Sequence, residues 1–234
     1  MESTRTASSQ PPAFRDATRV LSSVLAPLEK RVLISMATRM PRWINSDHLT
    51  ALALTAMLGA GLSYWLAAVT PIGLVLVVAC LAVNWFGDSL DGTLARVRQH
   101  QRPRYGYYVD HVVDMAGALF LFGGLALSGL MHPVLALALL VGYLMLAAEI
   151  YLAAHVLGEF RITYFQLGPT ELRIILSAGS LWAIVRPTVT LFGHSFLLFD
   201  VGAVVSLAGM AVVFTLTAIR HTAALYREEP IPMS

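Results

Sequence analysis

Long apolar stretches separated by short polar turns dominate this chain of 234 residues. Many of them approach or exceed the roughly 20 residues that a helix needs to cross a bilayer. The pattern therefore predicts an all-α integral membrane protein with a membrane domain at residues 49–226. Six transmembrane helices are expected, at Leu49–Val69, Ile72–Val97, Tyr105–Leu130, Pro133–Leu157, Thr170–Val185 and Asp200–Leu225.

The segment at residues 14–48 mixes basic and apolar residues at helical spacing. This pattern predicts an amphipathic interfacial helix in the headgroup plane, and a helix packed by its apolar side on the membrane domain fits it equally well. Pro27 is expected to kink or split the helix. Residues 1–13, rich in Ser and Pro, are expected to be disordered, and residues 227–234 to form a C-terminal tail.

Composition supports the membrane class, and charge predicts how the protein is oriented in the membrane. The chain is 57% hydrophobic and 13% charged, whereas soluble domains carry about 25% charged residues. Seven of the 16 Lys and Arg residues precede the first span, four lie between the second and third spans, and Arg186 alone falls on the other side. The positive-inside rule then predicts that both termini are cytoplasmic. We expect an inner-membrane protein with lipid partners and no nucleic-acid partner.

Four aspartates stand at helical spacing inside two of the predicted spans. Asp88 and Asp91 lie in the second span, and Asp110 and Asp114 lie in the third. A carboxylate in a bilayer costs roughly 2.5 to 3.5 kcal/mol, so four cost about 10 kcal/mol or more. Carboxylate oxygens are suitable ligands for Mg²⁺ or Mn²⁺. The spacing therefore predicts two antiparallel helices that direct their carboxylates at divalent cations.

The residues around these aspartates favour a phosphate ligand. Gly92, Ala95 and Gly106 leave room for a ligand to approach the backbone. Arg96 supplies a guanidinium that can donate two hydrogen bonds to one phosphate. Cations, an arginine and small residues together indicate a site that binds pyrophosphate.

The pattern D-x2-D-G-x2-A-R-x9-G-x3-D-x3-D, from Asp88 to Asp114, resembles the signature of the CDP-alcohol phosphotransferase family. Asn45 and Thr50 are similar to a stretch that opens the first helix of that family and helps to hold the nucleotide. The resemblance implies a phospholipid-synthesis enzyme in which a CDP-linked donor lays its pyrophosphate over two divalent cations. An acceptor alcohol attacks the phosphorus distal to the cytidine, and CMP leaves.

The same resemblance implies roles for individual residues and a homodimer. The metal ligands would be the four aspartates, Asp88, Asp91, Asp110 and Asp114. Contacts with the CDP donor would come from Asn45, Thr50, Asp88, Gly92, Ala95, Arg96 and Gly106. We expect the cluster to open toward the cytoplasmic leaflet.

The general base is open between two residues. Asp114 is the usual candidate in the family, but a carboxylate bound to a cation is a poor base. His111 is the other candidate, because histidine titrates near pH 6.5 when unperturbed.

The donor is also open. The Asp110-His111-x-x-Asp114 pattern and residues 168–171, ending in Glu171, are similar to the choline/ethanolamine phosphotransferase branch. Glu171 could contact substrate or simply stand in the first turn of a helix. Met115 departs from the Lys or Arg of phosphatidylglycerophosphate and phosphatidylinositol-type synthases, yet the length is that of the short microbial enzymes. CDP-diacylglycerol and a CDP-amino-alcohol both remain candidate donors.

Two other functions fit part of the pattern. A Mg-dependent intramembrane prenyltransferase also uses paired aspartates, but on distant helices. A carboxylate-lined divalent-cation transporter would not require Gly92, Ala95 and Arg96.

Three further charged residues lie in or beside the spans. Glu149 is expected to face a cavity or a polar partner, because it stands inside the fourth span. Arg161 and Arg173 could bind an anionic headgroup, although lipid phosphates are the favoured partners.

Overall fold

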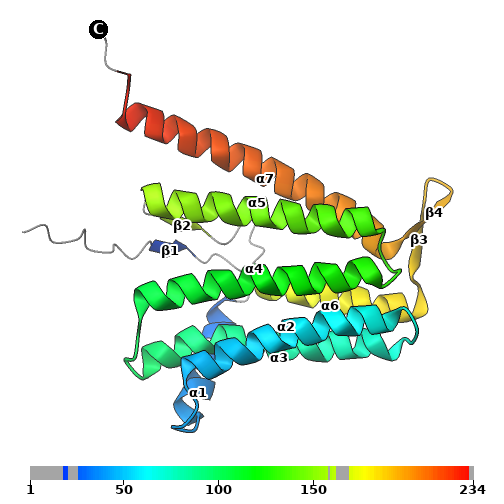
Figure 1. Ribbon diagram of the computed structural model, residues 1–234, viewed down its shortest axis with the longest axis horizontal. Coiled ribbons are helices and arrows are strands. Elements are labelled where there is room, and N and C mark those ends of the chain that lie inside the picture. Colours follow the sequence, from blue (N-terminus) through cyan, green and yellow to red (C-terminus); the bar gives the residue numbers. More distant parts are fainter. Residues whose placement is uncertain (1–17, 21–25, 158, 162–168, 232–234) are drawn as a thin grey trace, which may run out of the picture.

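The computed structural model describes residues 18–20, 26–157, 159–161 and 169–231, so the predicted disorder of residues 1–13 lies outside it. In the described part, most residues belong to seven helices, and the long helices run lengthwise through the molecule (Figure 1). The helices are α1 (Ala26–Arg39), α2 (Ser46–Ala67), α3 (Ile72–Val97), α4 (Pro103–Leu127), α5 (Pro133–Leu157), α6 (Pro169–Val185) and α7 (Leu198–Glu228).

Five of these helices, α2, α3, α4, α5 and α7, are long and apolar enough to cross a membrane. The expected count of six spans is not confirmed, because α6 has only 17 residues. At a rise of 1.5 Å per residue such a helix is roughly 26 Å long, shorter than the roughly 30 Å hydrocarbon core. The integral membrane class itself holds.

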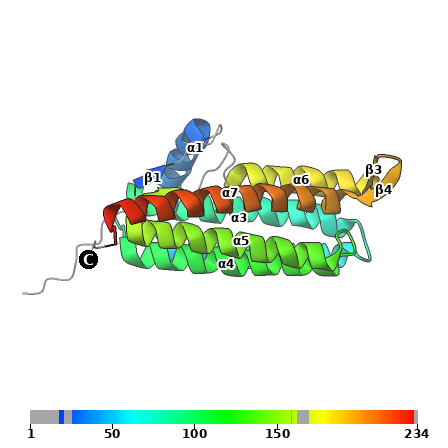
Figure 2. The same ribbon diagram turned by 90° about the horizontal axis from the view of Figure 1, so that it is seen from above.

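Two short β-structures lie at opposite ends of the helical bundle (Figures 1 and 2). The predicted turn after α6 contains an antiparallel hairpin of β3 (Thr188–Leu191) and β4 (His194–Leu197). Its two central residues, Phe192 and Gly193, have φ of 52° and 80°. Positive φ at both positions matches the twist of paired strands.

The helix expected from residue 14 onward begins only at Ala26, which corrects the predicted boundary. Before it, β1 (Thr18–Val20) pairs in parallel with β2 (Glu159–Arg161). Pro27 falls in the first turn of α1, where a missing N–H is tolerated, so it neither kinks nor splits the helix.

Helix α1 packs on the membrane domain, as one of the two interpretations of its amphipathic pattern requires. Leu33 and Ala37 of α1 are buried in a cluster with Leu49 of α2 and with Leu90 and Leu94 of α3. Part of the apolar surface of α1 is therefore covered by protein, whereas Leu28, Val32 and Ile34 stay exposed. A position in the headgroup plane stays a prediction.

Helix α2 contacts both α3 and α4 closely because glycines line its crossings. A Cβ added to Gly124 of α4 would lie 2.0 Å from the carbonyl oxygen of Gly61 on α2. A Cβ on Gly87 of α3 would lie 2.6 Å from the carbonyl oxygen of Leu49 on α2. Small residues at such crossings let helix backbones approach in membranes. Both aspartate-bearing helices are thereby held against α2.

Helices α5 and α7 are joined by a polar pair inside their interface. Glu149 of α5 lies with its Oε1 atom 2.5 Å from Nδ1 of His221 on α7, which confirms the expected polar partner for this glutamate. The Glu149 side chain is 10% exposed and that of His221 is 28% exposed. A contact of this kind is worth most where water is excluded.

Replacing His221 with leucine is expected to destabilise the protein, because the Glu149 carboxylate loses this partner. A buried polar group without a partner costs about 1 to 3 kcal/mol, so the melting temperature in detergent should fall. The double variant E149L/H221L should recover most of that loss, since replacing both partners by apolar groups is often neutral. An equally unstable double variant would contradict this account.

Candidate active site

The aspartates of α3 and α4 converge as their spacing predicts. Both helices pack on α2, with the Asp88 and Asp91 pair on one and the Asp110 and Asp114 pair on the other. The carboxylates of Asp88 and Asp110 are both close enough to Asp91 to repel it electrostatically. Negative charge from two helices is therefore gathered in one place.

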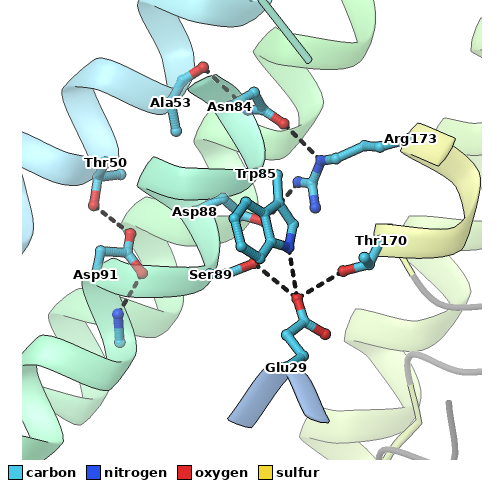
Figure 3. Close-up of polar contacts among 11 residues, drawn as sticks. Glu29, Thr50, Ala53, Asn84, Trp85, Asp88, Ser89, Asp91, Thr170 and Arg173 are labelled. Atoms are coloured by element: carbon cyan, nitrogen blue, oxygen red, sulfur yellow. Dashed lines mark hydrogen bonds and ion pairs between the residues drawn. The ribbon is translucent and has the colours of Figure 1, made fainter. Parts of the chain in front are cut away.

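Asp91 is oriented by two donors. The hydroxyl of Thr50 on α2 donates to Asp91 Oδ2 at 2.6 Å, and the backbone N–H of Gly92 donates to Oδ1 (Figure 3). Thr50 was expected to help hold the nucleotide, and its contact in the structure is with a proposed cation ligand. A direct contact of Thr50 with the nucleotide stays a prediction.

Asp88 forms an ion pair with Arg173, which the sequence analysis expected to face lipid phosphates. Arg173 of α6 places Nη2 2.6 Å from Asp88 Oδ2 and donates from Nε to Asn84 Oδ1 at 2.7 Å. The Asn84 amide in turn donates to the Ala53 carbonyl of α2 at 3.1 Å (Figure 3). The expectation that Arg173 faces lipid phosphates is therefore wrong. It points into the site and joins α6 to α3.

Sequence reasoning missed Asn84, although a signal was present. Asn84 stands one helical turn before Asp88 in an apolar span. An amide at that position needs a buried partner, and residues four apart share one helix face. The pairing with Arg173 could not be read in the same way, because 85 residues separate Arg173 from Asp88.

Of the predicted phosphate-binding residues, Gly92 and Arg96 lie near the end of α3 and Gly106 lies at the start of α4. A Cβ on Gly92 would meet the Arg96 guanidinium first, at 3.4 Å from Nη1, so the two residues are neighbours. Arg96 Nη2 also donates to Thr93 Oγ1 at 3.1 Å. A Cβ on Gly106 of α4 would meet nothing within 4 Å. Space beside Gly106 and a guanidinium beside Gly92 both suit an approaching phosphate.

A cavity of about 370 Å³ adjoins this end of α3. Asn45 and Ala95, both predicted to contact the donor, are among its lining residues. Asn45 also caps α2, because its side chain accepts the backbone N–H of His48 at 3.0 Å. The cavity is further lined by Ser46, Asp47, Leu94, Arg98, His100, Gln101 and Arg102.

Arg98 and Arg102 line this cavity and bind the backbone or side chains of neighbouring segments. Arg98 donates to the carbonyls of Met40 and Pro41, both at 2.9 Å, which anchors the turn between α1 and α2. Arg102 pairs with Asp47 at the start of α2. The Arg98 contacts hold the turn before α2 against the end of α3, and the Arg102 contact holds the start of α2 against the start of α4.

His111 is buried and held between aromatic rings. Its ring centroid lies 4.1 Å from that of Tyr107 and 4.3 Å from that of Tyr151 on α5. Nδ1 bonds the carbonyl of Tyr107, and since a carbonyl only accepts, the Nδ1 atom carries a proton. In the neutral ring, Nε2 is then the atom that can accept a proton. Asp114 interacts electrostatically with Tyr151 too, so both candidate bases stand near this tyrosine.

Glu171 lies in the first turn of α6, which begins at Pro169 as the helix-start interpretation predicts. An acidic side chain there is favoured by the helix dipole, and proline suits a first turn. A contact between Glu171 and substrate stays a prediction.

The site has the chemistry of a divalent-cation site without a preformed cluster. Within the described ranges, no three Asp, Glu, His or Cys side chains are arranged as ready ligands for one ion. Four carboxylates nevertheless come from α3 and α4, and Asp88 already holds a cationic group, the guanidinium of Arg173. Carboxylate oxygens are the type of ligand that Mg²⁺ and Mn²⁺ prefer, so the donor set of α3 and α4 is chemically suited to such an ion.

Comparison with known proteins identifies the family. A search of curated proteins finds no match to the chain. The family model described as CDP-alcohol phosphatidyltransferase matches residues 43–217. This stretch covers three quarters of the chain, runs from the turn before α2 into α7, and includes all four aspartates. The chain therefore belongs to the CDP-alcohol phosphatidyltransferase family, as a membrane transferase of phospholipid synthesis that uses a CDP-linked donor.

Proposed function

We propose that this enzyme transfers a substituted phosphate from a CDP-linked donor to an alcohol at the cytoplasmic leaflet. The acceptor oxygen bonds to the distal phosphorus, the bond from that phosphorus to the CMP oxygen breaks, and the acceptor proton passes to a base. The observation that supports this proposal best is the convergence of Asp88, Asp91 and Asp110, with a cavity lined by Ala95 one helical turn after Asp91 on α3. Carboxylates can hold the cations there, and the cavity can hold the nucleoside.

Each residue of the signature has a role in this proposal. Asp88, Asp91, Asp110 and Asp114 would hold two divalent cations. Bound cations would neutralise charge on the pyrophosphate and on the departing CMP. Arg96, whose guanidinium adjoins Gly92, would donate to a phosphate oxygen. Asn45 and Ala95 would contact the nucleotide from the cavity wall, and Gly106 would leave space for the donor. Positioning of the reactants supplies much of the remaining rate.

The base can be identified by separating chemistry from cation binding. His111 and Asp114 are the two candidates, and only Asp114 is also a proposed cation ligand. H111A and D114N should be compared for Mn²⁺ affinity by electron paramagnetic resonance and for CMP release. The variant that binds Mn²⁺ like the wild type but loses rate identifies the base.

The orientation and assembly of the enzyme are also proposals. The starts of α2 and α4 and the ends of α3 and α5 lie at one end of the bundle (Figure 1). Arg96, Arg98, Arg102 and Arg104 gather at that end, which favours the cytoplasm by the positive-inside rule. We place both termini and the site there, in a homodimer.

A donor panel tests the proposed function directly. Purified enzyme with Mg²⁺ should release CMP from CDP-diacylglycerol with a small polar alcohol, or from CDP-choline or CDP-ethanolamine with diacylglycerol. The donor that supports release also decides between the two candidate branches. Cation flux into vesicles without CMP release from any of the three donors would refute the proposal in favour of a transporter.

A further inference from the structure

Glu29, in the first turn of α1, accepts hydrogen bonds from two other helices. Its Oε1 atom lies 2.7 Å from Trp85 Nε1 and 3.3 Å from Ser89 Oγ, both on α3. The same atom lies 2.8 Å from Thr170 Oγ1 at the start of α6 (Figure 3). One carboxylate oxygen therefore connects α1, α3 and α6.

Two of these contacts lie beside the Asp88–Arg173 ion pair of the active site. Ser89 directly follows Asp88 on α3, and Thr170 stands one helical turn before Arg173 on α6. Arg173 and Asp88 form the second polar connection between the same two helices. The carboxylate of Glu29 thus fixes the first turn of α6 against the turn of α3 that carries Asp88.

Packing of α1 does not by itself require a carboxylate at this position. Leu33 and Ala37 already anchor α1 to the membrane domain through apolar contacts. Removing a carboxylate from water costs free energy unless donors satisfy it, and here three donors from two helices do so. The contacts of Glu29 therefore specify how α3 and α6 stand relative to each other.

We propose that Glu29 is a positioning residue of the active site. It holds the start of α6 against α3 so that Arg173 keeps the Asp88 carboxylate oriented for the cations and the CDP pyrophosphate. This proposal rests on the proposed function, in which Asp88 is a cation ligand. Glu29 acts through Arg173 and Asp88. Without its carboxylate, the start of α6 is released, and Arg173 moves with it.

The first test compares E29A, E29Q and E228A in the CMP-release assay, with Mg²⁺ as the varied component. Displacement of a reacting group by 1 Å can cost 100-fold in rate. We therefore expect E29A to lower kcat about tenfold and to raise the half-saturating Mg²⁺ concentration about fivefold. E29Q keeps an acceptor oxygen and should stay within about threefold of the wild type. E228A removes a carboxylate from the exposed end of α7 and should change neither value.

The second test needs no turnover. Mn²⁺ affinity, measured by electron paramagnetic resonance, should weaken about fivefold in E29A and be restored in E29Q. In a background carrying W43F, W65F and W182F, the emission of Trp85 should shift in E29A, because the indole N–H loses its acceptor. The Mn²⁺ affinity of E29A/T170V should equal that of E29A alone, since both changes remove one connection.

The outcomes separate this proposal from the proposed function. If E29A melts at a lower temperature but keeps the wild-type Mn²⁺ affinity and Mg²⁺ dependence, Glu29 is merely structural and the proposal is overturned. Additive losses in E29A/T170V overturn it as well. If the wild type releases CMP from no donor, the proposed function fails, and the Mn²⁺ affinities still decide: a loss confined to E29A supports Glu29 positioning, and equal affinities overturn it. Absence of Mn²⁺ binding by the wild type overturns both.

Discussion

Asp91→Ala is expected to reduce CMP release at least about 1,000-fold, which corresponds to roughly 4 kcal/mol of transition-state stabilisation. Asp91 lies close to carboxylates from both helices, since Asp88 and Asp110 interact with it electrostatically. Its two oxygens are oriented by Thr50 and by the backbone of Gly92. Alanine removes a proposed cation ligand, and losses of similar size are expected for D88A and D110A. Initial rates of CMP release at saturating donor and Mg²⁺ measure the effect.

Thr50→Val is the matched control for this variant. Valine keeps the shape of the side chain and leaves the Asp91 carboxylate in place, but it removes the hydroxyl that donates to Oδ2. We expect a loss of about 10- to 150-fold, because one oriented hydrogen bond to a charged group is worth roughly 1.5 to 3 kcal/mol. Substantial activity in D91A, in protein that melts like the wild type, would contradict the role of Asp91 as a cation ligand.

The apolar pattern predicted most of the fold because each long helix satisfies its own backbone inside a bilayer. The bounds of α3 and α5 agree with the predicted spans, and the starts of α2 and α4 lie within three residues of them. Hydropathy is a local property, so a single sequence displays it. The pattern predicted the number of membrane spans less well. The predicted fifth span corresponds to α6, whose 17 residues are too few to cross the hydrocarbon core.

In the site, too, local features could be predicted from the sequence and long-range contacts could not. Asp88 and Asp91 share a helix face at a spacing of three residues, and Asp110 and Asp114 do so at a spacing of four, so the carboxylate clusters were predictable from helix geometry. The roles of Arg173 and Glu29 were not, because both residues act across tertiary contacts. Arg173 pairs with a residue 85 positions away, and Glu29 with one 141 positions away. No periodicity in one chain encodes such pairings.

The missed β-structures have a different cause. The hairpin of β3 and β4 turns through Phe192 and Gly193, and phenylalanine is an uncommon residue at positive φ. The usual Asn-Gly or Asp-Gly signal was therefore absent. The amphipathic pattern begins at residue 14, upstream of the start of α1, because it includes Arg19 and Val20 of β1.

Gly87→Ala is expected to lower CMP release about 100-fold without removing any polar group of the site. A Cβ at this position would lie 2.6 Å from the Leu49 carbonyl oxygen and 3.0 Å from the Ala53 Cβ, both on α2. The two backbones must therefore separate by several tenths of an ångström to reach ordinary contact distance. Thr50 follows Leu49, so the 2.6 Å bond from Thr50 to Asp91 should lengthen or break. Misplacement of a reacting group by up to 1 Å can account for a loss of about this size.

Gly209→Ala separates this clash from the intrinsic effect of alanine. Gly209 lies in α7, where a Cβ would meet nothing within 4 Å. Alanine stabilises a helix interior by about 1 kcal/mol relative to glycine, so G209A should melt at or above the wild-type temperature with unchanged CMP release. G87A gains the same helical propensity, and its loss of activity can then come only from the α2–α3 crossing. Wild-type rates in G87A would show that the site tolerates this displacement, and that the close approach at Gly87 does not set the position of Asp91.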